Sequence, residues 1–243
     1  MPKATRNITY IHSPNTYKYS IIIPAAGQGT RMISYGAKSL IKLTPDLTVI
    51  QNQLNIIAQK FRYYEIIMVV GFQAYRVMRD TPNDIIKIEN ERYEETNVCR
   101  SIGMGLRAAT TNRVLIMYGD LVFNAATLDV KFNKGSSLII DSSDTMTPNE
   151  VGCTIIDGLV ENVLYELPNK WAQISFFVDK ELEMLKQIVW NPDNERLYGF
   201  EAINQIITWG GKFRAVLPSG IRVNDIDSSK DIPIAQKIAQ GIV

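Results

Sequence analysis

The residues best suited to chemistry lie in one stretch, SIIIPAAGQGTRMISYGAKSLIKL at positions 20–43. Small residues near its start leave backbone N–H groups uncovered, so a bound anion or the edge of a base can approach them closely. These small residues are Ala25, Ala26, Gly27 and Gly29. Arg31 and Lys38 add two cations to the same loop. Uncovered amides beside two cations predict a site for a nucleoside triphosphate.

Two widespread phosphate-binding patterns do not match this stretch. A Walker A loop requires Gly, four residues and then Gly-Lys-Ser/Thr, a spacing that the chain lacks. A dinucleotide-binding loop requires a third glycine where this chain has Met32, and an acidic residue after the next strand, where it has Gly71 and Phe72. The loop therefore belongs to neither type.

Two aspartates at distant points of the chain supply carboxylates. Asp120 ends the run IMYGD, and Asp227 lies within DIDSSKD at positions 225–231. Because the chain has one histidine, His12, and two cysteines, a Ser-His-Asp triad and a His- or Cys-based metal site are disfavoured. Mg²⁺ takes one or two carboxylates together with phosphate oxygens and water, so two aspartates would suffice for this ion. Taken alone, however, Asp120 reads better as a turn or helix-capping residue.

The first half of the chain alternates strands and helices. A buried strand over 21–23 should end at Pro24, which has no N–H for the sheet. The spacing of apolar residues predicts helices over 49–61, 73–79 and 98–109 and strands over 65–71, 85–88 and 114–118. This order predicts an α/β fold with a doubly wound, mostly parallel, Rossmann-like sheet that binds ligands outside the carboxyl ends of its strands. Asp120 follows such an end.

The second half has short strands separated by Gly, Asn and Pro turns. The expected strands are 138–140, 151–156, 159–165 and 173–178, and the expected helices are 180–189, 197–209 and 232–241. We interpret this half as a β meander on the substrate side. Since no linker interrupts the chain, we expect one domain over 1–243, with a nucleotide-binding half at about 20–135 and an acceptor-binding half at about 136–243. Residues 1–19 form an extension without an assigned function.

The composition narrows the choice of partners and environment. A net charge of +1 disfavours a nucleic-acid partner. No apolar run reaches membrane-span length and the N-terminus lacks the core of a signal peptide, so we expect a cytoplasmic protein without a membrane partner. Cys99 and Cys153 have no metal-ligand spacing and should be reduced thiols in or near the core. A homodimer is left open.

The phosphate-binding loop does resemble one known signature. Residues 27–32, GQGTRM, followed by KSL at 38–40, are similar to the signature loop of the nucleotidyltransferases that activate sugar phosphates and choline-type phosphates. Ala37 stands where that family usually has proline, a change in loop stiffness that retains the lysine. The resemblance implies a GT-A-like nucleotidyltransferase fold. It also implies catalytic roles for Arg31, Lys38, Asp120 and Asp227.

The same resemblance implies Mg²⁺ as the cofactor and a set of metal ligands. A hydrophobic strand ending in Gly-Asp carries the family's first metal aspartate, which corresponds to Asp120. The segment DIDSSKD resembles the family's closing Glu-Ile-Asp-Ser-x-x-Asp motif, whose middle aspartate corresponds to Asp227. Asp225 replaces the glutamate of that motif and is either a third ligand or a neighbour of one.

The expected nucleotide contacts extend beyond the loop. The run from Asn97 to Ser101 resembles a family segment that lies beside the pyrimidine and ribose, although Asn97 would also cap a helix. Thr30 belongs to the signature loop, and Gln73 follows the second strand, where it either touches the base or faces solvent.

The candidates on the acceptor side are Lys170, Trp171 and Glu201, of which Trp171 fits a core position better than a ligand contact. The resemblance thus implies an Mg²⁺-dependent transfer from a nucleoside triphosphate, with CTP as the first choice, to a phosphorylated small molecule. The alternatives are a sugar-1-phosphate uridylyl- or thymidylyltransferase, a GT-A glycosyltransferase and a non-catalytic nucleotide-binding protein.

Overall fold

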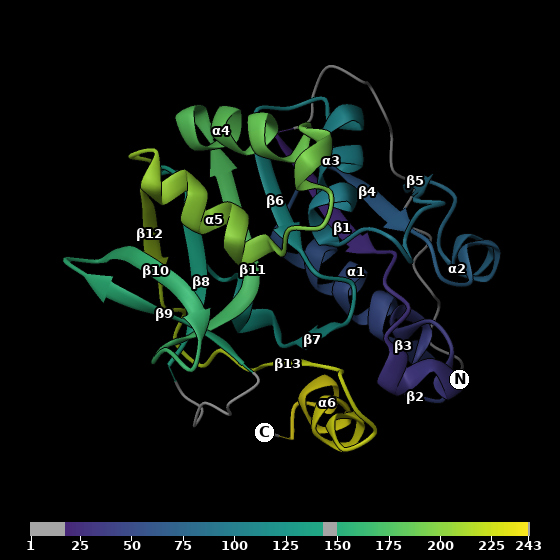
Figure 1. Cartoon of the computed structure of the whole chain (residues 1–243). Coiled ribbons are helices and arrows are strands. Elements are labelled where there is room, and N and C mark those ends of the chain that lie inside the picture. The colour runs from purple at the N-terminus through teal and green to yellow at the C-terminus, as the bar shows by residue number, and fades with distance from the viewer. Residues whose placement is uncertain (1–17, 143–149, 243) are drawn as a thin grey trace.

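A sheet of nine strands forms the centre of the computed structural model, which describes residues 18–142 and 150–242. The strand order is β5-β4-β1-β6-β11-β8-β12-β10-β9 (Figure 1). Its first four strands are parallel to one another: β5 Ile86–Glu89, β4 Tyr64–Val70, β1 Tyr19–Ala25 and β6 Arg113–Met117. This part is the predicted parallel sheet. The expectations for residues 1–17, His12 among them, lie outside the described residues.

The other five strands continue the same sheet. β11 Lys170–Val178 runs antiparallel to both β6 and β8 Ser137–Asp141, and β12 Phe213–Val216 runs parallel to β8. β10 Leu159–Tyr165 and β9 Val151–Ile156 form an antiparallel hairpin at the far edge. The strands expected to form a β meander are therefore the second half of one sheet, which is joined to the first half by the pairing of β11 with β6.

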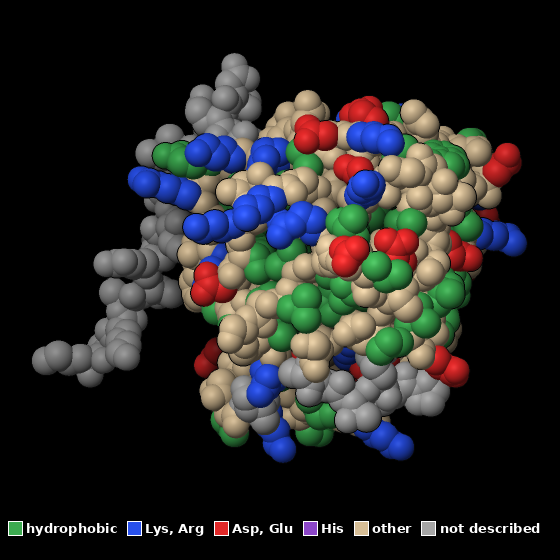
Figure 2. Space-filling model, turned by 90° about the vertical axis from the view of Figure 1, so that its left-hand side faces the viewer, with side chains coloured by type: hydrophobic (Ala, Val, Ile, Leu, Met, Phe, Trp, Pro, Cys, Tyr) green, Lys and Arg blue, Asp and Glu red, His purple; other side chains and the backbone are tan. Residues whose placement is uncertain are grey.

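The β9 end of the sheet leaves large hydrophobic side chains on the surface. Ile156 at the end of β9 is 60% exposed, and Leu217 after β12 is 50% exposed. Figure 2, which views this side of the molecule, shows hydrophobic side chains next to a group of lysine and arginine side chains. Contiguous apolar patches mark interaction surfaces, whereas single exposed hydrophobic side chains are ordinary. The homodimer stays a prediction.

Helices cover both faces of the sheet (Figure 1). α1 Val49–Lys60 and α2 Ala74–Asp80 pack on the face to which Ile21 and Ile23 contribute. The opposite face, which contains Ile22, carries α3 Val98–Ala108, α4 Asp179–Val189 and α5 Gly199–Thr208. The run Ile21 to Ile23 thus alternates between two cores, as expected for a strand buried on both sides.

A third, smaller core lies beside the signature loop. α6 Asp231–Gln240 packs there with the two-stranded hairpin of β2 Lys42–Thr44 and β3 Leu47–Thr48. Met32 of the signature loop and Ile226, next to Asp227, are both buried in this cluster. The cluster therefore holds the loop and the Asp227 segment together. Four 3₁₀ turns complete the described elements: Thr30–Tyr35, Lys38–Leu40, Ala125–Leu128 and Pro192–Asn194.

The expectation that the first strand ends at Pro24 is wrong, because β1 continues to Ala25. β1 pairs with β6 only over Ser20–Ile22, so the missing N–H of Pro24 interrupts no ladder bond on that side. The carbonyl of Pro24 still accepts a hydrogen bond from Gly119 N, at 3.0 Å. The proline therefore fixes the turn that follows β6 instead of ending the strand.

A short antiparallel pair was not predicted from the sequence pattern. It consists of β7 Leu121–Phe123 and β13 Val223–Asp225. Three residues are too few for a recognisable periodicity. In this pair Leu121 lies opposite Asp225. Asp120 immediately precedes β7, and Asp227 lies two residues after the end of β13, so the pairing brings the two predicted aspartates together.

Candidate active site

The signature loop borders a cavity of about 580 Å³ at the carboxyl ends of β1, β5 and β6. Gly29 has a φ of 56°, a left-handed conformation that glycine adopts without strain. Hydrogen bonds from Phe72 N to Ala26 O and from Gly119 N to Pro24 O, both 3.0 Å, fix the loop to the neighbouring strand ends. Seven predicted nucleotide-binding residues line the cavity: Ala25, Ala26, Gly27, Gly29, Thr30, Asn97 and Ser101.

Lys38 joins the two predicted metal-binding aspartates. Its Nζ lies 3.0 Å from Asp120 Oδ2 and 2.6 Å from Asp227 Oδ1. Burial alone would lower the pKa of Lys38, but the two carboxylates outweigh it and raise the pKa above its ordinary value. The ammonium therefore stays protonated. One cation and two carboxylates leave a net negative charge at this point, which favours a further cation.

Asp227 is held by a cap at the start of α6. Oδ2 of Asp231 accepts hydrogen bonds from Asp227 N at 3.0 Å and from Ser228 N at 2.6 Å. Ser228 Oγ donates to the same oxygen at 3.0 Å. Ile226 N donates to Asp120 O at 3.2 Å, which links this segment to the Asp120 turn. Backbone and side-chain bonds thus fix both carboxylates.

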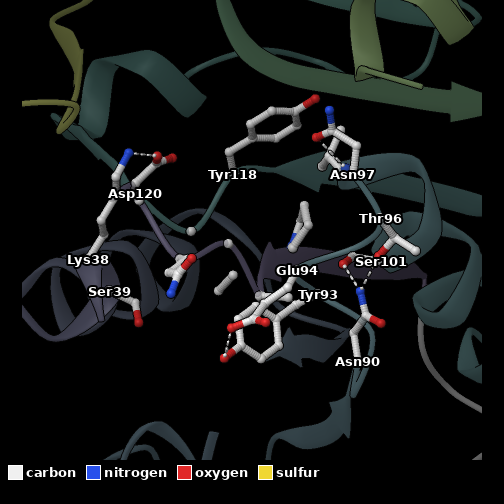
Figure 3. Close-up of a pocket in the computed structure, with 18 of the residues that line it drawn as sticks. Lys38, Ser39, Asn90, Tyr93, Glu94, Thr96, Asn97, Ser101, Tyr118 and Asp120 are labelled. Carbon is white, nitrogen blue, oxygen red and sulfur yellow. Dashed lines mark hydrogen bonds and ion pairs between the residues drawn. The ribbon is translucent and has the colours of Figure 1, made fainter. Parts of the chain in front are cut away.

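The opposite wall of the cavity is built around Asn90 and the start of α3 (Figure 3). Asn90 Nδ2 donates to Thr96 Oγ1 at 3.2 Å and lies 3.4 Å from Ser101 Oγ, which is buried. Asn97 Oδ1 accepts from Val98 N at 2.8 Å, so Asn97 both caps α3 and lines the cavity. The cavity thus has a charged end at Lys38 and Asp120 and a hydrogen-bonding end at Asn90.

A second cavity of about 150 Å³ adjoins the first and shares Tyr118, Asp120 and Tyr198 with it. Its other lining side chains are mostly acidic or aromatic: Glu150, Tyr165, Lys170, Trp171, Gln173, Phe200, Asp225 and Asp227. Asp120 therefore faces both cavities, and the bond-making centre of a two-substrate reaction would lie there.

The buried cation of the second cavity is Lys170. It pairs with Glu150 and lies 3.8 Å from Asp225 Oδ1. Gln173 Nε2 donates to Asp225 Oδ2 at 3.2 Å. Burial raises the pKa of Asp225, and Lys170 acts in the opposite direction. Trp171 is buried, as the core interpretation expects, yet its Nε1 has no hydrogen-bond partner among the described residues.

Three predicted site residues line neither cavity. Arg31 is exposed on the turn that follows the signature loop. Gln73 Oε1 accepts from Ala37 N at 3.3 Å, so this side chain supports the loop before Lys38. Glu201 Oε2 accepts from Tyr198 N at 2.7 Å and caps α5. All three lie close to the site and support or flank its walls.

Several lining residues were not predicted, chiefly Asn90, Tyr93, Glu94, Tyr118 and Tyr198. Asn90 follows β5 at a carboxyl strand end, which is the position where such a contact could have been sought. Tyr118 precedes the Gly119-Asp120 pair directly and separates the two cavities. Tyr198 stands at the start of α5, far away in sequence and three residues before the predicted Glu201.

The aspartates fit a magnesium ion by their chemistry. Carboxylate oxygens are hard donors, and Mg²⁺ typically uses one or two of them and completes its shell with phosphate oxygens and water. Asp120 and Asp227 already converge on one cation, Lys38 Nζ. Within the described ranges no group of three or more His, Cys, Asp and Glu side chains is arranged to hold a metal. Asp120 and Asp227 are therefore the pair that would hold the ion, and the role of Asp225 as a third ligand stays a prediction.

The nucleotide-binding half of the chain matches the model of a known family. Residues 21–134 match the family model of the MobA-like NTP transferase domain, so the resemblance of the signature loop is confirmed. No protein of curated function matches the sequence. In the parts of the chain that the structure describes, no helix is long and apolar enough to span a membrane.

Three solved structures show the same fold over nearly the whole chain. The inositol-1-phosphate CTP transferase from T. maritima has a TM-score of 0.74 and 14% identity, with 94% of this chain and 98% of that chain covered. The CTP:phosphocholine cytidylyltransferase from Streptococcus pneumoniae has a TM-score of 0.70 and 18% identity, with 90% of this chain and 98% of that chain covered. A putative glucose-1-phosphate thymidylyltransferase from Bacillus anthracis has a TM-score of 0.72 and 13% identity, with 93% of this chain and 96% of that chain covered. The predicted fold class is therefore confirmed.

Proposed function

We propose that this protein is a Mg²⁺-dependent nucleotidyltransferase that joins a nucleoside triphosphate, preferably CTP, to a phosphorylated small molecule and releases pyrophosphate. The observation that carries the proposal is the position of Asp120. It lines both cavities and shares Lys38 with Asp227. A nucleotide in the larger cavity and an acceptor in the smaller one would therefore meet at this aspartate.

The chemistry required is the neutralisation of charge between two phosphate groups. The acceptor phosphate is ionised at neutral pH and needs no base, whereas its approach to the α-phosphorus is opposed by negative charge. Lys38, fixed by two carboxylates, places a permanent positive charge beside the uncovered amides of the loop. Mg²⁺ held by Asp120 and Asp227 would supply further positive charge on phosphate oxygens. The proposal also assigns Arg31 to the phosphates, which requires its exposed side chain to turn inward.

The preference for CTP rests on the hydrogen-bonding end of the larger cavity. Ser101 and Asn90 meet there, opposite the small residues of the loop. A site built to hydrogen-bond one base edge rejects other bases, because its own polar groups are then left unpaired. The fold similarity to two CTP-using enzymes agrees with this choice, and the similarity to a putative thymidylyltransferase makes UTP and dTTP the next candidates.

The acceptor is assigned to the smaller cavity. Lys170 is a donor that suits oxygen atoms of the acceptor, and Trp171 lines the same cavity beside it. Asp225 lies beside Lys170 and is proposed to orient the acceptor-binding lysine. Glu201 would act indirectly, since it holds the helix start that carries Tyr198.

The test is incubation of the protein with each nucleoside triphosphate, a panel of phosphorylated acceptors and Mg²⁺, followed by detection of pyrophosphate. We expect release that depends on both substrates, with CTP the best donor. Thermal unfolding with each nucleotide provides a second readout, because a ligand at a hundred times its Kd stabilises by about 2.7 kcal/mol. Greater stabilisation by ATP or GTP than by any pyrimidine nucleotide would contradict the choice of base. Absence of pyrophosphate with every pair would contradict the reaction class.

A further inference from the structure

Gln53 is a buried amide on α1 that lies against the turn carrying Asp120. Its side chain has no exposed surface. Nε2 donates to Tyr118 O and to Leu121 O, both at 2.8 Å. These carbonyls stand on either side of the Gly119-Asp120 pair. One amide group therefore clamps both ends of the turn that presents the carboxylate.

The orientation of this amide follows from its surroundings. The reverse orientation would place Oε1 against two carbonyl oxygens, which cannot donate. In the observed orientation Oε1 is buried without a hydrogen-bond partner among the described residues. A buried acceptor without a partner destabilises the fold, whereas an apolar side chain of similar size would not have this penalty. Core packing alone therefore does not explain a glutamine here, and the two donated hydrogen bonds do.

The other contacts of the turn leave a specific role for Gln53. Gly119 N is bound to Pro24 O at 3.0 Å and Ile226 N to Asp120 O at 3.2 Å, so the turn is attached to β1 and to the Asp227 segment. Gln53 fixes the same turn from the side of α1. We infer that Gln53 is a positioning residue that holds the Asp120 carboxylate against Lys38. The kinetic part of this inference rests on the proposed function.

The adjacent residue, Asn52, is a matched control. It is also a buried amide of α1, with 7% of its surface exposed. Its Nδ2 donates to Phe123 O at 3.1 Å, at the far end of β7 from Asp120. Loss of this bond should weaken the packing of α1 on β7 and leave the Asp120 turn in place. A comparison of the two positions thus separates positioning from general stability.

The first test is a double-mutant cycle for the Lys38–Asp120 pair, measured by denaturant unfolding with Lys38→Met and Asp120→Asn. The cycle is repeated in the Gln53→Met and Asn52→Leu backgrounds. In the native background we expect Lys38 and Asp120 to be coupled by about tenfold in the unfolding equilibrium constant. This coupling should fall to about twofold or less in the Gln53→Met background and should be retained in the Asn52→Leu background. Gln53→Asn, which keeps the amide but is one methylene shorter, should give the same loss if Gln53→Met does not fold.

The second test compares kinetic parameters in the pyrophosphate assay. Gln53→Met should lower kcat by about tenfold or more and change the KM for the nucleotide by less than about twofold, whereas Asn52→Leu should change neither. The inference would be overturned if the Lys38–Asp120 coupling persisted in the Gln53→Met background or fell equally in the Asn52→Leu background. It would also be overturned if no coupling were measured with residues 52 and 53 unchanged. A protein that releases no pyrophosphate but shows the expected cycle would refute the proposed function and leave the positioning role standing.

Discussion

The side chain of Lys38 crosses directly over Gly29. A Cβ atom at position 29 would lie 2.7 Å from Lys38 Cε and 3.3 Å from its Cδ and Cγ. Gly29 therefore meets two requirements, since its φ of 56° is left-handed and its bare Cα leaves room for the lysine stem. The reach of Lys38 to its two aspartates depends on both.

Gly29→Ala should displace Lys38 and lower kcat by about tenfold or more, because a preorganised cation then leaves its position. The left-handed backbone should also destabilise the fold by about 1–2 kcal/mol. Gly158→Ala is the control, since Gly158 has a φ of +77° and nothing within 4 Å of its added Cβ. It should lose similar stability in thermal unfolding and keep full activity. Equal activity in both variants would contradict the contact.

Asp120→Asn and Asp227→Asn should each lower turnover by about a hundredfold or more, because a neutral amide keeps the size and loses the charge. Circular dichroism should show an intact fold. Asp129→Asn is the control, as its carboxylate is exposed and pairs with Lys60 at 3.5 Å, away from the cavities. Turnover at the native rate in either site variant would refute a role for that carboxylate.

Lys38→Ala should remove about 3 kcal/mol of transition-state stabilisation, as loss of one preorganised donor does elsewhere. The effect should fall on kcat, since Lys38 lies at the centre where the substrates would meet. Steady-state kinetics with varied acceptor measure this directly. An unchanged kcat with a raised acceptor KM would assign the lysine to acceptor binding.

Gly199→Ala should disturb both cavities at once. An added Cβ would lie 2.0 Å from Tyr118 Oη and 3.6 Å from Trp171 Cη2, so the tyrosine between the cavities must move. We expect a loss of about tenfold or more in kcat/KM for both substrates. The double variant Gly199→Ala, Tyr118→Phe removes the clashing hydroxyl and should recover most of the loss. A double variant no better than the single one would show that the clash is not the cause.

The two cysteines should be unreactive in the native protein. Both are free and buried, and burial raises the pKa of each thiol from 9.0 to about 12. Iodoacetamide at pH 8 should label neither until the chain is unfolded. Because the unfolded thiols lose protons at lower pH than the native ones, stability should fall as pH rises above about 9. Rapid labelling of the native chain would contradict this, and a double cysteine-to-alanine variant should lack that part of the pH dependence.

The parts of the site that could be predicted are those encoded by local sequence. The loop that ends in Gly29 and Thr30 is read directly from its small residues, and Lys38 follows at a fixed distance. The convergence of Asp120 and Asp227 could be expected only from the family resemblance, because the β7–β13 pair that produces it has no periodic pattern. The side-chain directions of Arg31, Gln73 and Glu201 depend on neighbouring backbone. Their places outside the cavities could therefore not be predicted.

The ion pair of Lys38 with Asp227 joins residues that are 189 positions apart in the sequence, whereas Lys38 and Asp120 are 82 positions apart. Contacts this distant form late, since the chain must close a long loop before any of their energy is gained. During synthesis the signature loop and Asp120 would emerge well before the strand β13 and helix α6 that bring Asp227. The nascent chain thus cannot assemble its full set of charged groups until its last segment has docked, and the hydrophobic cluster of Met32, Ile226 and α6 is what such docking would complete.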